Sequence, residues 1–235
     1  MRALSSKEID WVLFDADHTL FDFDRSARHS LAYMFGEIDF HVTEEQLQLY
    51  FKINKACWRE YEEGKVDRET LARKRFDIFF EVVGITGVDP VWFNAAYLAQ
   101  LPNHVYHLEI AEELVQSLRR KYRLGMITNG LAAVQRPRLK RSPLNPHFDV
   151  VVVSGEIGLA KPDPAYFAYA HKEMAFPRKE RVLVVGDSLY SDIKGGNDYG
   201  FRTCWYNPEN ILKEEGIEPE FEVKSHKAIL ELLVN

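Results

Sequence analysis

Four short polar segments of this sequence carry the residue types needed for nucleophilic, acid–base and metal-assisted chemistry. Each one ends a run of residues that predicts a buried strand. The segments are Asp15-Ala-Asp17-His-Thr19, Thr128-Asn129-Gly130, Lys161-Pro162, and Gly186-Asp187-Ser188 with Asp192 behind it. In an open parallel sheet, ligands bind at the carboxyl ends of the strands. We therefore expect the four segments to converge on one site.

Each segment also has an ordinary structural interpretation when it is taken alone. A surface pair of aspartates usually faces water, and Thr-Asn-Gly after a strand is typical of a turn or a helix cap. A lysine before proline is most often a solvated loop residue, and the last segment could be a cap with an exposed helix face. The combination, in this order and each at a strand end, is what favours a shared site.

The elements that must position these segments alternate along most of the chain. Short apolar runs predict strands over residues 11–14, 124–127, 150–153, 182–185 and 202–206. Helical patterns lie between them at residues 109–120, 131–139, 164–174 and 191–199. This alternation predicts an α/β fold with a Rossmann-like parallel sheet covered on both faces.

The alternation stops between Phe21 and Leu101, where only helical patterns are found. They span residues 24–35, 43–62, 67–83 and 89–98. Thr43-Glu-Glu-Gln46 resembles a capping box, and Gly64 and Gly84 mark helix ends. We therefore predict an α/β core domain at residues 1–21 and 101–235, with an all-helical domain inserted at residues 22–100.

The four segments resemble the four motifs of the haloacid dehalogenase-like hydrolase superfamily. The inserted helical block resembles the cap domain of subfamily I of that superfamily, so the resemblance covers nearly the whole chain. A bacterial subgroup of this superfamily is similar in more detail. The similar features are Thr128-Asn129-Gly130 followed by Gln135 and Arg138-Leu139, and residues 58–64 of the cap. That subgroup contains house-cleaning pyrimidine 5′-nucleotidases.

The resemblance implies that Asp15 is the nucleophile and that Asp17 transfers the proton. Asp15 would form an aspartyl-phosphate, which divides hydrolysis into two easier displacements. Asp17 would protonate the departing oxygen and then take a proton from the attacking water. Two carboxylates suit this chemistry, because one carboxylate cannot perform both tasks at once.

The resemblance also implies how the phosphoryl group is held. Thr128 would supply a hydroxyl, and the following Asn129 and Gly130 would supply backbone N–H groups at a helix start. Lys161 would place a positive charge where negative charge sits in the transition state.

A magnesium site is implied by the same resemblance. Its ligands would be the side chains of Asp15 and Asp187 and the backbone carbonyl of Asp17, with Asp192 as a water-mediated ligand. An oxygen-only ligand set suits Mg²⁺, and a hard cation would offset the repulsion between the Asp15 carboxylate and the phosphate.

Two details of the first segment refine the assignment. Dehalogenases of this superfamily have no aspartate at the position of Asp17, so Asp17 favours phosphate chemistry over halide chemistry. His18 replaces the glycine or acidic residue of many relatives, and we interpret it as a loop residue rather than a proton relay.

Substrate specificity is expected to reside in the cap, which would close over the site and exclude water. Phe21 and Phe23 lie where the chain leaves the first segment, which ends at Thr19, and we predict that they contact the substrate. Further candidates are Trp58, Tyr61 and the basic run Arg73-Lys74-Arg75-Phe76. The alternative is that these aromatic residues form the core of the cap and that the basic residues are solvated.

Composition restricts the partners and the location. Hydrophobic residues make up 46% of the chain and charged residues 28%, and the net charge of −6 gives no general attraction to nucleic acid or anionic membranes. Cys57 and Cys204 lack metal-ligand spacing and are expected to be buried free thiols. No segment has the roughly 20 apolar residues of a membrane span, so a cytoplasmic location is expected.

Taken together, the sequence predicts a Mg²⁺-dependent phosphomonoesterase acting on a small phosphorylated metabolite, with a nucleoside 5′-monophosphate as the expected substrate. A phosphosugar or phosphoglycolate-type phosphatase, or a phosphomutase, would keep the same four motifs under a different cap. A binding protein on an inactive hydrolase fold is a third alternative, but such a protein would have lost a catalytic residue. Asp15, Asp17, Lys161 and Asp187 are all present.

Overall fold

A computed structural model describes residues 8–234 of the chain, and these residues divide into two compact units. Residues 8–22 and 106–234 form an α/β unit, and Phe23–Val105 form a helical unit. Of the predicted domain ranges, residues 1–7 and 235 lie outside the described residues. The roles of core and cap domain that the sequence suggests for the two units remain predictions.

The α/β unit is built on one six-stranded parallel sheet in the order β3-β2-β1-β4-β5-β6. The strands are β1 (Trp11–Asp15), β2 (Arg123–Thr128), β3 (Val150–Val153), β4 (Val182–Gly186), β5 (Arg202–Tyr206) and β6 (Phe221–Val223). Every residue of β1 and β4 is buried, as expected for central strands covered on both faces. The predicted α/β fold class is confirmed.

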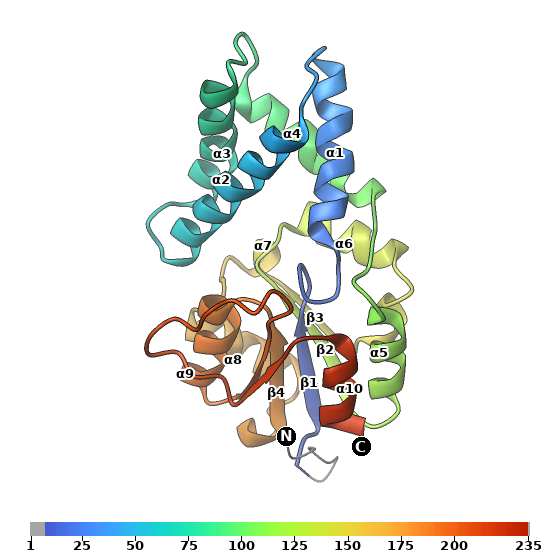
Figure 1. The fold of residues 1–235 in the computed structure, drawn as a ribbon. Helices are drawn as coiled ribbons and strands as arrows, with labels where there is room; N and C mark the ends of the chain where they lie inside the picture. The colour runs from blue at the N-terminus through green and yellow to red at the C-terminus, as the bar shows by residue number, and fades with distance from the viewer. Residues whose placement is uncertain (1–7, 235) are drawn as a thin grey trace. The chain divides into compact units, whose positions relative to one another are not determined.

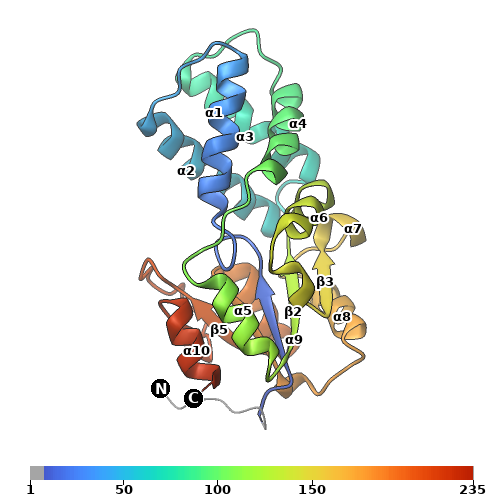
Figure 2. The same ribbon diagram turned by 90° about the vertical axis from the view of Figure 1, so that its right-hand side faces the viewer.

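Helices cover both faces of this sheet. They are α5 (Ala111–Arg119), α6 (Ala132–Arg141), α7 (Ser154–Ile157), α8 (Pro164–Glu173), α9 (Gly195–Tyr199) and α10 (His226–Val234), with short 3₁₀ turns at Asn145–His147 and Lys179–Arg181. Figures 1 and 2 show α5 and α10 together on one face of the sheet and α8 and α9 on the other. A core cluster that includes Leu13, Ile127, Val184 and Phe167 fills the space between the sheet and α8.

Two parts of the α/β unit differ from the sequence prediction. The helix predicted over residues 191–199 is divided into a π-helical segment, Leu189–Lys194, followed by α9. The backbone N–H groups of Asp192 and Ile193 both donate to the Ser188 carbonyl, at 3.0 and 3.2 Å, which widens the first turn. The strand β6 was not predicted, because three residues at a sheet edge give no apolar run.

The helical unit contains α1 (Phe23–Glu37), α2 (Glu44–Glu62), α3 (Arg68–Val83), α4 (Pro90–Gln100) and a 3₁₀ turn at Leu101–Asn103. Side chains that cap the first turn explain where three of these helices begin. Thr43 and Gln46 form the predicted capping box, Asp67 accepts from the Thr70 N–H, and Asp89 accepts from the Val91 N–H.

Aromatic rings form the core of the helical unit. Phe76 lies 4.9 Å from Phe93 and 5.2 Å from Tyr50 between ring centroids, and Phe35 lies 5.1 Å from Phe93. All four side chains are fully buried. Seven of the fourteen Phe, Trp and Tyr residues at positions 22–100 are buried, whereas Trp58 and Tyr61 are only partly buried. The alternative interpretation, that the aromatic residues form the core of the insertion, therefore holds for half of them.

The basic run at residues 73–75 divides between the surface and this core. Arg73 and Lys74 pair with Asp77 and Glu60 at the surface. Arg75 is buried and donates to two amide oxygens, Asn54 Oδ1 at 2.9 Å and Asn94 Oδ1 at 2.6 Å.

Both cysteines are buried and unbridged, as predicted from their neighbours in the sequence. Burial raises the pKa of the Cys57 and Cys204 thiols, which keeps them protonated. Across residues 8–234, none of the helices combines the length and the apolar character that a membrane crossing requires.

Candidate active site

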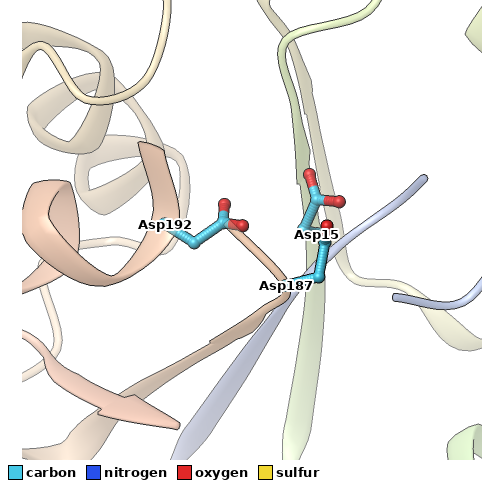
Figure 3. Close-up of side chains that lie close together, drawn as sticks. All are labelled: Asp15, Asp187 and Asp192. Atoms are coloured by element: carbon cyan, nitrogen blue, oxygen red, sulfur yellow. The ribbon is translucent and has the colours of Figure 1, made fainter. Parts of the chain in front are cut away.

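Three carboxylates meet at the carboxyl edge of the sheet. Asp15 is the last residue of β1 and Asp187 follows β4, the strand that pairs with β1. Asp192 approaches them from the π-helical segment, as Figure 3 shows. One oxygen from each of the three carboxylates lies within 4.8 Å of the others. Two of the predicted strand-end segments therefore converge as expected.

Gly186 makes the approach of Asp192 possible. A Cβ atom at position 186 would lie 2.2 Å from Asp192 Oδ2, which is far inside van der Waals contact. The same Oδ2 accepts a hydrogen bond from the Ser188 N–H at 3.1 Å. The glycine of the fourth segment is thus required for the close approach of a carboxylate.

Lys161 lies in the middle of this acidic cluster. Its Nζ is 2.5 Å from Asp15 Oδ1 and 2.6 Å from Asp192 Oδ1, and it also donates to the Ile127 carbonyl at 3.2 Å. The three donors of the ammonium are therefore satisfied, although its side chain is only 2% exposed. Lys161 does not end a strand as the sequence predicted, because it lies in the loop between α7 and α8; its side chain nevertheless reaches Asp15 and Asp192.

Asn129 fixes the backbone that carries this lysine. The Lys161 N–H donates to Asn129 Oδ1 at 2.8 Å, and Asn129 Nδ2 donates to the Lys161 carbonyl at 2.9 Å. The second and third predicted segments are therefore joined by a pair of hydrogen bonds. In the structure the Asn129 side chain positions Lys161, a task that the sequence did not indicate.

Burial dominates the electrostatics of the cluster. It raises the pKa of Asp15 well above its usual value, with Asp192 and Asp187 adding to the effect and Lys161 opposing it. Burial likewise raises the pKa of Asp187 to about 6, against the lowering effects of His18, Lys161 and a hydrogen bond from Thr19. For Lys161, burial alone would lower the pKa, but Asp15 and Asp192 raise it well above its usual value.

The composition of the cluster fits a divalent cation. Three carboxylates face a single ammonium, so the ionised cluster has an excess of two negative charges in a buried place. Its donor atoms are all oxygen, the preference of Mg²⁺ and other hard cations. A divalent cation would neutralise the excess and lower the cost of ionising Asp15 and Asp187 together.

The Asp17 carboxylate is bound by two side chains that do not belong to this cluster. Its Oδ1 accepts from Arg138 Nη1 at 2.6 Å and its Oδ2 accepts from Gln135 Nε2 at 2.5 Å. Both donors come from α6. In the sequence, Gln135 and Arg138 contribute only to the subgroup resemblance and indicate no role, because their distance from Asp17 in the fold cannot be read from the chain.

The second segment is held at the end of β2 by a tyrosine that the sequence did not indicate. The Thr128 N–H donates to Tyr166 Oη at 2.8 Å, and this hydroxyl donates to the Val152 carbonyl at 2.8 Å. Thr128 Oγ1 accepts from the Gly130 N–H at 3.1 Å. Thr128 and Gly130 thus belong to one tight turn beside Lys161.

The prediction that Phe21 contacts the substrate requires a correction. Phe21 is fully buried, and its ring packs against the guanidinium of Arg138 at 4.7 Å and against the His107 ring at 5.3 Å. Its ring faces are therefore occupied inside the α/β unit. Phe23 is the first residue of α1 and belongs to the helical unit, and its contact with the substrate stays a prediction.

The chain is similar in sequence and in structure to proteins of one known family. A sequence profile of the haloacid dehalogenase-like hydrolases matches residues 9–200. Pyrimidine 5′-nucleotidase YjjG of Escherichia coli is 37% identical, covering 95% of this chain and 97% of that protein. Pyrimidine 5′-nucleotidase PynA of Streptococcus pneumoniae is 34% identical, covering 95% and 94%. The hydrolase YfnB of Bacillus subtilis, solved bound to magnesium, has a TM-score of 0.92 at 30% identity, covering 97% and 100%.

The charge excess predicts that Lys161→Met destabilises the metal-free protein by about 3–5 kcal/mol at pH 7, because buried carboxylates lose their counter-ion. The variant's carboxyl groups should bind protons more readily in the folded state than in the unfolded state. The stability lost relative to the unsubstituted protein should therefore shrink as the pH falls toward 5. Urea unfolding in chelator at both pH values measures this difference.

The matched control is Lys194→Met, whose ammonium pairs with Asp198 on the surface. That exposed pair should contribute less than about 1 kcal/mol. Equal losses in the two variants would contradict the electrostatic account of Lys161.

Proposed function

The chain belongs to the haloacid dehalogenase-like hydrolase family and is a phosphatase, and from this premise we propose that it hydrolyses nucleoside 5′-monophosphates with Mg²⁺ through an aspartyl-phosphate. The observation that carries the proposal is the position of Asp15. This carboxylate ends the central strand β1, and Lys161 donates a hydrogen bond to one of its oxygens. Asp17, the carboxylate that would transfer the proton, follows two residues later.

In the first step, Asp15 attacks phosphorus and the bond to the leaving oxygen breaks. Lys161 occupies Asp15 Oδ1, so Oδ2 is the oxygen available for attack. Asp17 gives its proton to the departing oxygen, which leaves as an alcohol. The products of this step are the free nucleoside and a phosphorylated Asp15.

In the second step, water attacks the phosphorus of the aspartyl-phosphate. Asp17, now ionised, accepts a proton from that water, and Asp15 departs as a carboxylate. Inorganic phosphate is released, and both aspartates return to their starting forms. The reaction therefore requires no further reactant beyond water.

Negative charge on the phosphoryl group is held by Lys161 and by the turn at Thr128. The buried ammonium of Lys161 acts in a place with little water, where its interaction with developing charge is strong. The hydroxyl of Thr128 and the backbone N–H groups at the start of α6 supply further donors.

The residues that would hold Mg²⁺ are Asp15, Asp187 and Asp192, together with the backbone carbonyl of Asp17. A divalent cation held there would offset the negative charge of the carboxylates and of the phosphoryl group, which would reduce the repulsion that opposes attack by Asp15. The role of Asp192 would include holding Lys161 beside Asp15, since its Oδ1 accepts from Nζ at 2.6 Å.

The proposed substrate class is supported by two relatives that are both named as pyrimidine 5′-nucleotidases. They match over 94–97% of their own lengths, so the likeness extends over the helical unit as well as the α/β unit. We propose pyrimidine deoxynucleotides such as dUMP and dTMP ahead of purines. A cytoplasmic location, as predicted from the sequence, belongs to the same proposal.

We expect turnover to require added Mg²⁺ and to stop in excess chelator. Asp187→Asn should weaken Mg²⁺ binding by about tenfold or more, because it removes a charged oxygen ligand. Calorimetric titration of the protein with MgCl₂ measures the affinity without reference to activity. Asp198→Asn, which alters an exposed carboxylate paired with Lys194, is the control and should bind as the unsubstituted protein does.

We expect Asp15→Asn to abolish turnover and to leave no phospho-enzyme that acid quenching can trap. Asp17→Asn should be nearly inactive on nucleotides but should still be phosphorylated by p-nitrophenyl phosphate, whose leaving group needs little protonation. Rapid quenching with radiolabelled substrate distinguishes the two variants. Unchanged turnover in Asp15→Asn would place the nucleophile elsewhere.

The substrate proposal is tested by comparing kcat/KM for dUMP, dTMP, UMP, GMP, phosphoglycolate and glucose phosphates. We expect a pyrimidine nucleotide to have the highest value. If a phosphosugar or phosphoglycolate exceeds every nucleotide by about tenfold, or about 1.4 kcal/mol in transition-state binding, the nucleotidase assignment is wrong. The phosphatase mechanism would then stand with another substrate class.

A further inference from the structure

The carboxylate of Asp17 is held at both oxygens by one helix. Arg138 Nη1 binds Oδ1 at 2.6 Å, Gln135 Nε2 binds Oδ2 at 2.5 Å, and Arg138 Nη1 also lies 3.4 Å from Gln135 Oε1. The two donors are three residues apart on α6, so they lie on the same side of that helix. This arrangement fixes both the position and the plane of the carboxylate.

Gly130 provides the room that Gln135 requires. A Cβ atom at position 130 would lie 2.4 Å from Gln135 Nε2 and 2.7 Å from its Cγ. The first turn of α6 brings Gln135 back over this glycine, since the Gln135 N–H donates to the Leu131 carbonyl at 2.8 Å. The glycine of the second segment is therefore needed for the close approach of a side chain that binds Asp17.

Arg138 is a costly residue to place here for stability alone. Its side chain is fully buried, and Nε and Nη2 have no hydrogen-bond partner among the described residues. Among those residues its only carboxylate partner is Asp17, while the guanidinium stacks on the Phe21 ring at 4.7 Å. Apolar replacements of buried ion pairs are often neutral or stabilising, so packing gives no reason for this charge.

We infer that Gln135 and Arg138 are positioning residues that hold the Asp17 carboxylate toward the oxygen that leaves phosphorus. The inference rests on the proposed function, in which Asp17 transfers the proton. The Asp17 side chain is 23% exposed whereas that of Arg138 is 0% exposed, so Arg138 binds Asp17 from its buried side. We call Gln135 and Arg138 the clamp. Each carboxylate oxygen accepts one hydrogen bond from the clamp and retains a second lone pair for a proton or a water.

The consequence is that losing the clamp harms the reaction in proportion to its need for proton transfer. A displacement of about 1 Å in a reacting group can cost on the order of 10²-fold in rate. A poor leaving group needs the proton of Asp17, while p-nitrophenolate departs with little help. Loss of the clamp should therefore slow the reaction of substrates with poor leaving groups and leave the reaction of p-nitrophenyl phosphate nearly unchanged.

The test compares phenyl phosphate with p-nitrophenyl phosphate in the phosphorylation step, measured by rapid quenching under single-turnover conditions. For Arg138→Met and Gln135→Met we expect about tenfold or more loss with phenyl phosphate, within the range that general acid catalysis contributes. With p-nitrophenyl phosphate the loss should stay below about threefold, since that leaving group needs little protonation. Arg136→Met is the matched control, because Arg136 lies on the same helix but pairs with Glu156 at the surface. It should behave as the unsubstituted enzyme.

Two further variants separate positioning from folding. Arg138→Lys keeps the charge but loses the planar guanidinium, so the variant should retain the fold. It should still lose more rate with phenyl phosphate than with p-nitrophenyl phosphate. In an Asp17→Asn background, Arg138→Met should cause little additional loss, because the group that it positions no longer transfers a proton. Equal losses with both phenyl esters, or full additivity with Asp17→Asn, would overturn the inference.

The outcome does not depend on which metabolite is the natural substrate, since both probes are simple aryl phosphates. A phosphosugar preference would contradict the nucleotidase proposal and leave this inference standing. Activity of Asp15→Asn toward the aryl phosphates would contradict the proposed mechanism, and the inference about Asp17 would fall with it.

Discussion

A single buried ammonium shared by two of three carboxylates is the interaction on which the rest of the site depends. Taking charges out of water costs several kcal/mol for each ion, and the cost is recovered only with close pairing and complete hydrogen bonding. Lys161 meets this condition through Asp15, Asp192 and the Ile127 carbonyl. The ionised cluster still has an excess of negative charge, and a divalent cation of the kind that we propose here would compensate it.

The parallel sheet makes this concentration of charge possible by bringing distant segments to one edge. Asp15 and Asp187 follow adjacent strands, and the absence of a Cβ at Gly186 allows Asp192 to reach them from a widened helical turn. Gly130 has the corresponding function beside Gln135. Both glycines therefore act through the space that they leave, since neither has the positive φ angle that would require glycine for the backbone alone.

The sequence was sufficient to predict the fold class and the residues at the strand ends, because buried strands and their polar termini are local patterns. It could not indicate Tyr166 or the roles of Gln135 and Arg138, whose partners lie far away along the chain. Phe21 shows the opposite error. Its position directly after the catalytic loop suggested contact with the substrate, but the fold uses its ring as the packing surface for Arg138. Adjacency in sequence indicates which residue is near a site and does not indicate which way its side chain points.

The same distinction changes the argument about substrate recognition. The helical unit is rich in aromatic residues that could in principle stack on a nucleotide base, yet rings such as Phe35, Phe76 and Phe93 are buried against one another. A ring that supports the packing of its own unit cannot also present a face to a base. Trp58 and Tyr61 differ, because they are only partly buried and contact each other edge to face. If base stacking contributes to recognition, partly exposed rings of this kind must supply it. The number of aromatic residues in the insertion therefore does not by itself indicate a base-binding site.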